Sequence, residues 1–351
     1  MTGRLKVAIV STALGPGTIF TTPPLFYGGL EEVSALRARY LLEQGHKVYL
    51  FAAQGSEGAY RARWQGSPVP EFIEEPTEAD FLKHRDVLED VDFIVDDGWA
   101  AAVAQAYPQK SIKVWHGSQS PLMYALAGKV RQFGVSRAHA DLIARLTGDS
   151  GVGYIYNAVD ANEYPLVKEK EDYLFYLNRI DRDKGAHVFV RLCAELGVRC
   201  YMIGEDLLVN DQGYAHWIMQ HLPSNVEYLG RHVTDKVKLD LLGHARAVVA
   251  PLSPLYFEVF GLYAVESAFT GTQLIAMRNG ALPEIAPCAR FADSYEELFR
   301  LTAQALREEP PRPEECREKA LRWDYRKVWE DLTGLSPVQL LGQRVNKRED
   351  G

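Results

Sequence analysis

The strongest constraint on the fold is a repeated alternation of short apolar runs with helical segments. An apolar run at residues 6–11 is followed by a loop, by helical periodicity at residues 30–44, and by a second apolar run at residues 46–52. Apolar strands without polar alternation are typical of a parallel sheet that is covered on both faces. The alternation restarts at Tyr173, after a polar segment at residues 161–172 that contains a proline.

This restart predicts two Rossmann-like α/β domains in series, which suits a chain of 351 residues with 47% hydrophobic content. We expect the first domain to span residues 1–165 and the second residues 166–324. A C-terminal helix at about residues 325–345 is expected to pack back on the first domain. Parallel sheets bind ligands at the carboxyl ends of their strands, so the sequence predicts that the two domains face each other across a ligand-binding cleft.

The charge of the chain restricts its partners. The formal net charge is −8 and no cluster of Lys and Arg stands out, which argues against nucleic acid as a partner. An acidic protein that binds an anion must place a few cations locally. No run approaches the roughly 20 apolar residues of a membrane span, and no signal-peptide pattern precedes the first strand. We therefore expect a cytoplasmic protein; peripheral membrane contact and oligomeric state stay open.

The cysteines carry little functional signal. Their spacing contains no Cys-x-x-Cys and no Cys/His pattern of a zinc site. We therefore expect buried free thiols. The four positions are Cys193, Cys200, Cys288 and Cys316.

The segment at residues 256–266 is the first candidate site. It follows an apolar run that ends at Pro251, and a helical pattern begins at about Gly261. Glu258 and Glu266 bracket this helix start, where backbone N–H groups can receive a phosphate. A phosphate site between two carboxylates suits a ligand with phosphates and hydroxyls, such as a sugar nucleotide. The alternative is a surface loop and an amphipathic helix with a solvated Glu266.

In its setting, this Glu-x7-Glu pattern resembles the retaining GT-B glycosyltransferases, family 4 in particular. The resemblance implies that Glu258 lies beside the transferred sugar and that Glu266 binds the ribose hydroxyls. It also implies that Phe260, Gly261 and Leu262 contribute to donor binding.

The first domain contributes two further candidates. Gly28 and Gly29 precede the first helix and could let backbone approach a phosphate, although a plain turn explains them as well. Their surroundings resemble the first glycine loop of the same family, its compact antibiotic-tailoring members above all. His116 ends an apolar strand, and the resemblance implies a position near the donor sugar; a histidine satisfied within the core is the alternative.

The loop at residues 177–185 resembles the family's Gly-Arg-x-x-x-x-Lys-Gly. The resemblance implies that Arg179 and Lys184 clamp the donor diphosphate. Arg grips phosphate oxygens in a fork and Lys adds a point charge; the alternative is two solvated cations. Two Asp-x-Asp patterns, at residues 90–92 and 181–183, could suggest a metal. Because a basic pair would neutralise the diphosphate, we expect no metal.

Two more predicted strand ends carry Gly204 and the tripeptide Arg231-His232-Val233. The resemblance implies that this part of the chain holds the nucleotide base. Plain strand-end turns explain the same residues equally well.

Together these features predict a retaining, metal-independent glycosyltransferase that moves a sugar from a nucleotide-diphosphate sugar to the hydroxyl of a small molecule or a glycan. A UDP-sugar is favoured as co-substrate, a GDP-sugar is the alternative, and no cofactor is expected. His116, Glu258, Arg179 and Lys184 are the predicted catalytic residues. The alternatives are a nucleotide-sugar epimerase of the same architecture, a glycosidase, and a non-catalytic sugar-binding protein.

Overall fold

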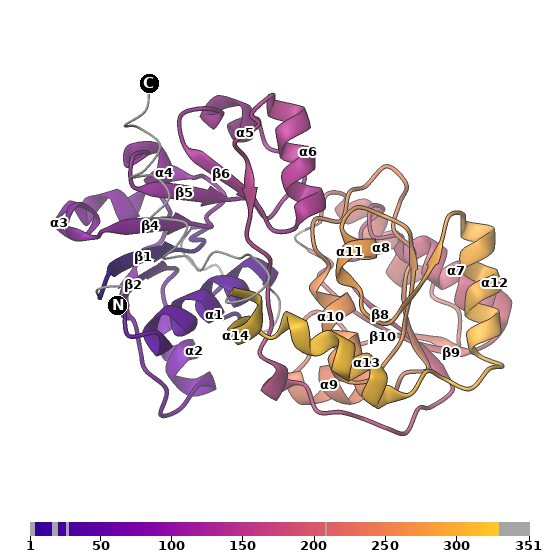
Figure 1. Ribbon diagram of the computed structural model, residues 1–351. Coiled ribbons are helices and arrows are strands. Elements are labelled where there is room, and N and C mark those ends of the chain that lie inside the picture. Colours follow the sequence, from indigo (N-terminus) through magenta and orange to yellow (C-terminus); the bar gives the residue numbers. More distant parts are fainter. Residues whose placement is uncertain (1–3, 16–19, 26–27, 208, 330–351) are drawn as a thin grey trace. The chain divides into compact units, whose positions relative to one another are not determined.

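The computed structural model describes residues 4–15, 20–25, 28–207 and 209–329 (Figure 1). The chain forms two compact units. The first contains Met1–Val159 and Asp324–Gly351, and the second contains Asp160–Trp323.

The first unit alternates strands and helices along the chain. Its elements are β1 (Lys6–Val10), α1 (Gly29–Glu43), β2 (Lys47–Ala52), α2 (Ser56–Arg63), β3 (Glu71–Glu74), η1 (Asp80–Lys83), α3 (Arg85–Asp90), β4 (Phe93–Asp96), α4 (Ala102–Ala106), β5 (Ser111–Val114), α5 (Pro121–Leu126), β6 (Arg131–Gly134), α6 (Arg137–Thr147), β7 (Gly153–Tyr154) and α14 (Tyr325–Lys327).

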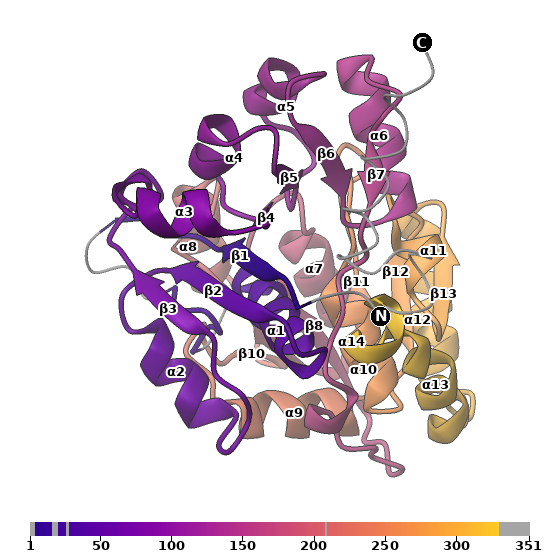
Figure 2. The ribbon, with the colours of Figure 1, turned by 60° about the vertical axis from the view of Figure 1, so that its left-hand side comes forward.

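Its sheet has seven strands in the order β3-β2-β1-β4-β5-β6-β7. Every pair in it is parallel. Helices α1 and α2 cover one face, and α3 and α4 cover the other (Figures 1 and 2). Both faces are therefore buried, which explains why residues 7–10 of β1 are apolar without alternation and at most 1% exposed.

The second unit repeats the pattern. Its elements are η2 (Ala161–Glu163), β8 (Tyr173–Leu177), α7 (Ala186–Leu196), β9 (Arg199–Ile203), α8 (Gln212–Gln220), β10 (Val226–Tyr228), α9 (Asp235–His244), β11 (Ala247–Ala250), α10 (Leu262–Phe269), β12 (Leu274–Met277), α11 (Leu282–Ile285), β13 (Ala289–Ala292), α12 (Tyr295–Ala305), α13 (Pro313–Ala320) and η3 (Leu321–Trp323).

The second sheet has six strands in the order β10-β9-β8-β11-β12-β13, and its pairs are parallel as well. The prediction of two Rossmann-like parallel-sheet units is therefore confirmed. In each unit the strand order reverses at one place, between β1 and β4 and between β8 and β11. Loops leave such a switch point in opposite directions, so the carboxyl ends of these four strands are where a ligand site is expected.

The chain passes between the units at Val159 and Asp324, which are joined by a parallel bridge. This boundary lies six residues before the predicted one, since Tyr164 already belongs to the second unit and stacks on Phe269 with ring centroids 6.1 Å apart. The described part of the C-terminal segment belongs to the first unit, where the Tyr325 hydroxyl donates to Glu43 Oε1 of α1 at 2.8 Å. Residues 330–345 of the predicted last helix lie outside the described residues.

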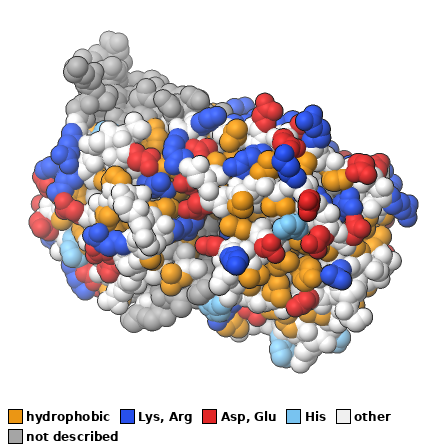
Figure 3. Space-filling model, turned by 90° about the horizontal axis from the view of Figure 1, so that it is seen from below, with side chains coloured by type: hydrophobic (Ala, Val, Ile, Leu, Met, Phe, Trp, Pro, Cys, Tyr) orange, Lys and Arg blue, Asp and Glu red, His pale blue; other side chains and the backbone are white. Residues whose placement is uncertain are grey.

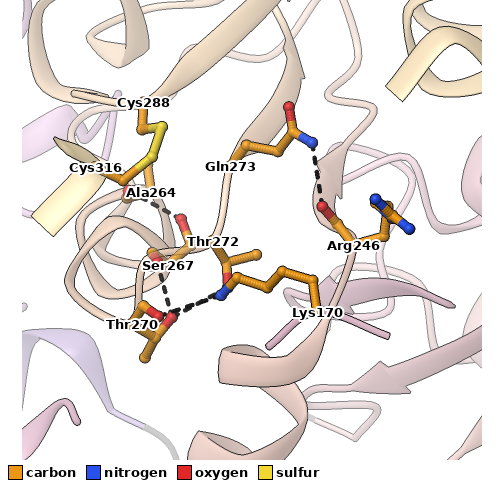
Figure 4. Close-up of a disulfide and its surroundings, with 9 residues drawn as sticks. All are labelled: Lys170, Arg246, Ala264, Ser267, Thr270, Thr272, Gln273, Cys288 and Cys316. Carbon is orange, nitrogen blue, oxygen red and sulfur yellow. Dashed lines mark hydrogen bonds between the residues drawn. A yellow bond between two sulfur atoms is a disulfide. The ribbon is translucent and has the colours of Figure 1, made fainter. Parts of the chain in front are cut away.

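The prediction of four free thiols is wrong. Cys193 is bonded to Cys200, with Cα atoms 6.5 Å apart. Cys288 is bonded to Cys316, with Cα atoms 5.2 Å apart (Figure 4). The spacing gave no sign of these pairs, because the sheet and the helices that pack on it decide which cysteines meet.

Lys170 belongs to the polar segment at residues 161–172, and its hydrogen bonds tie this segment to the second unit. Its Nζ donates to Thr272 Oγ1 at 2.9 Å and to Thr270 O at 3.3 Å (Figure 4), and also to Gly243 O at 2.6 Å. These three acceptors carry no charge, and burial lowers the pKa of Lys170 to about 7.

This low pKa predicts a pH-dependent contribution to stability. Between pH 7 and 10.5 the unfolded chain binds a proton at Lys170 that the folded chain has lost, so stability should rise with pH across this range. One proton corresponds to a slope of at most about 1.4 kcal/mol per pH unit. Urea unfolding at several pH values should show that the free energy of unfolding rises more steeply with pH for wild type than for Lys170→Met. Lys168→Met, which removes an exposed lysine paired with Glu314, should follow wild type; parallel curves for wild type and Lys170→Met would contradict the prediction.

The surface of the molecule mixes both signs of charge. On the face seen in Figure 3, basic and acidic side chains are interspersed rather than gathered into one basic area. Within the described ranges, no helix is long and apolar enough to cross a membrane.

Candidate functional site

The switch point of the second unit holds a buried ion pair. Lys184 lies in the loop after β8 and Glu258 in the loop after β11, and Lys184 Nζ is 2.5 Å from Glu258 Oε2. The two residues are 7% and 4% exposed. Burial alone would lower the pKa of Lys184, but the Glu258 carboxylate outweighs burial and the pKa is raised. Lys184 is therefore a fixed cation at this edge of the sheet.

Two tyrosines enclose this pair. Lys184 Nζ lies 4.3 Å from the ring centroid of Tyr256, a cation–π contact, and the Tyr263 hydroxyl donates to Glu258 Oε2 at 3.3 Å. Burial raises the pKa of both phenols, so each stays neutral and can act as a hydrogen-bond donor. The backbone of Glu258 is fixed as well, because its N–H donates to Asn279 Oδ1 at 2.8 Å.

Glycines allow the loops to converge around the pair. A Cβ at Gly185, directly after Lys184, would collide with the carbonyl of Pro251. A Cβ at Gly280 would collide with the backbone of Glu258. These contacts explain why glycine follows the lysine in the loop and why glycine stands in the loop after β12.

Arg179 lies in the same loop as Lys184. Its Nη1 is 3.6 Å from Asp181 Oδ2, and its charge acts on the Tyr256 hydroxyl together with that of Lys184. The two basic residues predicted as a clamp therefore share one loop, and the charges of both oppose the rise in the pKa of Tyr256. Both carboxylates of the Asp-x-Asp pattern at residues 181–183 also face Asn210, whose Nδ2 is 2.9 Å from Asp181 Oδ2 and 3.4 Å from Asp183 Oδ2.

The helix start at Gly261 lies three residues after Glu258. Gly261 has φ +83° and precedes Leu262, the first residue of α10. Glu266 lies one turn into this helix, where its Oε1 accepts from the Tyr164 hydroxyl at 2.9 Å and lies 4.0 Å from Lys238 Nζ. Phe260 is 1% exposed and packs edge-on against Trp323, so only its backbone can serve a ligand.

The residues predicted to hold the base lie beside each other after β9 and β10. Gly204 N donates to Gly230 O at 3.4 Å, and Arg231 Nη1 donates to Glu205 Oε1 at 3.2 Å. His232 is exposed, whereas Val233 packs against the core of the unit. The structure thus brings Gly204 and Arg231 together at one edge of the sheet.

The switch point of the first unit is organised by Asp97, directly after β4. His116 Nε2 lies 2.8 Å from Asp97 Oδ1, and Oδ2 accepts from Ser34 Oγ at 3.1 Å and from Arg37 Nη1. Burial alone would raise the pKa of Asp97, but Arg37 and His116 outweigh it and the pKa lies below its ordinary value.

This network sets the state of His116. Burial lowers the pKa of His116, so its ring is neutral at neutral pH. An ionised Asp97 can only accept, so His116 Nε2 carries the proton and Nδ1 keeps its lone pair.

Gly28 and Gly29 lie at the start of α1, the helix that supplies Ser34 and Arg37. Gly28 has φ +155°, and a Cβ there would meet Glu31 Oε2 at 2.6 Å. Glu31 is buried and accepts from Thr12 Oγ1 at 2.7 Å. Approach of a phosphate to the backbone at Gly28 and Gly29 stays a prediction.

Sequence reasoning missed several residues of both sites. In the first unit these are Asp97 and Arg37, which are at most 1% exposed. In the second unit they are Tyr256 and Tyr263, which enclose the ion pair of Lys184 and Glu258. One signal was present: Asp96 and Asp97 end an apolar run, which is the position of ligand-binding or network-forming carboxylates in a parallel sheet.

Comparison with known protein families gives a match for the second unit. Residues 161–323 match the family model described as "Glycosyl transferases group 1". No match was found among curated proteins.

Solved structures match nearly the whole chain. AviGT4, a glycosyltransferase involved in avilamycin A biosynthesis, is 26% identical with a TM-score of 0.70, over 97% of this chain and 98% of that one. A sucrose-phosphate synthase from Thermosynechococcus elongatus is 17% identical with a TM-score of 0.71, over 97% and 98%. The Anabaena protein HepE, in complex with UDP and glucose, is 16% identical with a TM-score of 0.69, over 94% and 99%. The chain therefore has the two-Rossmann-like GT-B fold, and its residues 161–323 are similar to the glycosyltransferase group 1 family.

Proposed function

We propose that the protein transfers a sugar from a nucleotide-diphosphate sugar to an acceptor hydroxyl, with retention of configuration and without a metal ion. The observation that carries this proposal is the buried pair of Lys184 and Glu258 at the switch point of a group 1 glycosyltransferase domain. A fixed cation against a carboxylate suits a donor whose diphosphate and sugar ring lie side by side.

In this proposal the positive charges act on the leaving group. Lys184 and Arg179 neutralise the charge that grows on the diphosphate, and backbone N–H groups at Gly261 and Leu262 add the field of a helix start. Lys184 keeps its charge at neutral pH, because its pKa is raised. A buried cation interacts more strongly with phosphate than a solvated one, so a preorganised site accelerates departure of the diphosphate.

The carboxylates orient the two sugars of the donor. Glu258 positions the transferred sugar or supports its developing positive charge, and Glu266 accepts hydrogen bonds from the ribose. Glu266 already accepts from the Tyr164 hydroxyl, which leaves its second oxygen for a ribose hydroxyl. His116, with a lone pair on Nδ1, serves the transferred sugar from the first unit.

A UDP-sugar is the proposed donor, since HepE was solved with UDP-glucose. A thermal-shift panel with UDP, GDP, ADP and TDP tests the base. The matching nucleotide, at about 100 times its Kd, should add about 2.7 kcal/mol of stability. Equal shifts from all four would contradict recognition of a base.

Product analysis with labelled UDP-glucose tests the reaction class. A transferase needs an acceptor and forms a new glycoside, whose anomeric configuration reports retention. A sugar released with inverted stereochemistry and without an acceptor would favour an epimerase, and nucleotide-sugar binding without any product would favour a binding protein.

A further inference from the structure

The exposed large apolar side chains of the first unit have similar positions along the chain. Among its described residues, the large apolar side chains that are exposed each lie in a segment that follows the carboxyl end of a strand. They are Leu14 and Leu25 after β1, Trp99 after β4, and Tyr124 in α5 after β5. This is the edge at which parallel sheets bind ligands, so their distribution differs from the single scattered apolar residues of an ordinary surface.

Trp99 is held on a rigid backbone. Its N–H and that of Ala100 donate to the two oxygens of Glu78, at 2.7 and 2.8 Å. Lys113 Nζ, itself buried, donates to the carbonyl of Gly98. Ala101 adopts φ +51°, a left-handed conformation that a non-glycine residue rarely takes. The chain fixes this short loop from both sides, yet leaves the indole 46% exposed.

The indole lies beside the functional residues of the first unit. A Cβ at Gly117, directly after His116, would meet a ring carbon of Trp99 at 3.2 Å. Asp97, which binds His116, is two residues before Trp99. Glu78, which binds the backbone of Trp99, also donates its own N–H to Ala13 O at 3.2 Å. This bond brings the segment that contains Leu14 close to the loop of Trp99.

The polar side chains beneath this edge are already bonded within the protein. Glu78, Asp97 and Lys113 are 4%, 1% and 1% exposed. Each is bonded to backbone or side-chain partners of the same unit. These three buried side chains are therefore engaged within the protein, whereas Trp99 beside His116 is 46% exposed and can contact a ligand.

We propose that Trp99 is the platform on which the acceptor stacks, and that the acceptor is a small molecule with a flat apolar face next to the hydroxyl that receives the sugar. An aromatic ring and the C–H face of a pyranose share this chemistry. The proposal rests on the proposed function, in which an acceptor hydroxyl receives the sugar, and it assigns the acceptor to the first unit.

Isothermal titration of the full-length protein saturated with UDP tests the proposal. Two probes separate the sources of a flat face: 4-nitrophenyl β-D-glucopyranoside carries an aromatic ring and a pyranose, and methyl β-D-glucopyranoside carries the pyranose alone. For each probe that wild type binds, Trp99→Ala should lower the affinity by about tenfold or more. Trp99→Phe should retain part of the affinity. A loss confined to the aryl probe identifies an aromatic acceptor, and an equal loss for both identifies a sugar.

The control is Trp217→Ala, which removes a tryptophan that is 52% exposed on α8 of the second unit. It should bind both probes as wild type does. Unchanged affinities in Trp99→Ala, or no binding of either probe to wild type, would overturn the platform. A UDP titration of the same proteins before saturation reports separately on the proposed function. Absence of UDP binding in wild type would overturn that function, whereas UDP binding in wild type confines a failure to the acceptor proposal.

Discussion

Replacement of Lys184 by alanine is expected to lower kcat for sugar transfer by about 10²-fold, the scale for removal of one preorganised group that stabilises developing charge. Lys184 is 7% exposed and its ammonium is held beside Glu258, so water cannot replace it without reorganising the loops after β8 and β11. Steady-state rates of UDP release from UDP-glucose measure the effect. A rate near that of wild type would remove Lys184 from the proposed mechanism.

The same loop supplies a control. Arg182 lies two residues before Lys184, but its side chain is 66% exposed and pairs with Asp211 at 3.3 Å. Arg182→Ala removes a cation from the loop without touching the buried pair. Exposed ion pairs contribute about 0–1 kcal/mol, so this variant should keep both its stability and its rate.

Loss of Lys184 also leaves a buried carboxylate unpaired, and this effect on the fold must be separated from catalysis. Removing one partner of a buried pair costs about 3–5 kcal/mol of stability, whereas removing both charges is often neutral. The double variant Lys184→Met with Glu258→Gln should therefore recover the melting temperature that Lys184→Ala loses. It should stay inactive, because stability alone does not supply the charge on which departure of the diphosphate depends.

Replacement of Asp97 by alanine is expected to cost the first unit about 3–5 kcal/mol of stability. The carboxylate accepts from Ser34, Arg37 and His116, and its loss would leave the fully buried Arg37 guanidinium without its counter-charge. Urea or thermal unfolding measures the effect. Asp90→Ala is the matched control, since Asp90 pairs with Lys6 at 2.7 Å where both side chains are about half exposed, and it should cost about 0–1 kcal/mol.

The pH dependence of this contribution has a definite sign. Because the pKa of Asp97 lies below its ordinary value, the contribution is present above the pKa of the unfolded chain, near pH 4. It is lost as the pH falls through the folded value. Wild type and Asp97→Asn should therefore converge in stability at acid pH and separate at neutral pH. A constant difference across this range would show that the charge of Asp97 does not stabilise the fold.

The sequence alone predicted the features that depend on local patterns. Apolar runs without alternation predicted parallel strands, their restart at Tyr173 predicted a second sheet, and both follow from burial on two faces. Candidate positions followed from the rule that parallel sheets bind ligands at the carboxyl ends of strands. His116, Lys184 and Glu258 lie at such ends because the loops after β5, β8 and β11 begin there.

Only the tertiary structure decided which of these residues meet. Lys184 and Glu258 are 74 positions apart, and Arg37 and Asp97 are 60 apart. Each pair forms because the strand order places their loops at one switch point. The cysteine pairs and the attachment of Lys170 have the same origin, since the approach of distant segments depends on how helices pack on a sheet. Periodicity in a sequence reports which face of an element is buried, whereas partners, burial and hence the pKa of Asp97 or Lys184 are set by the elements that cover that face.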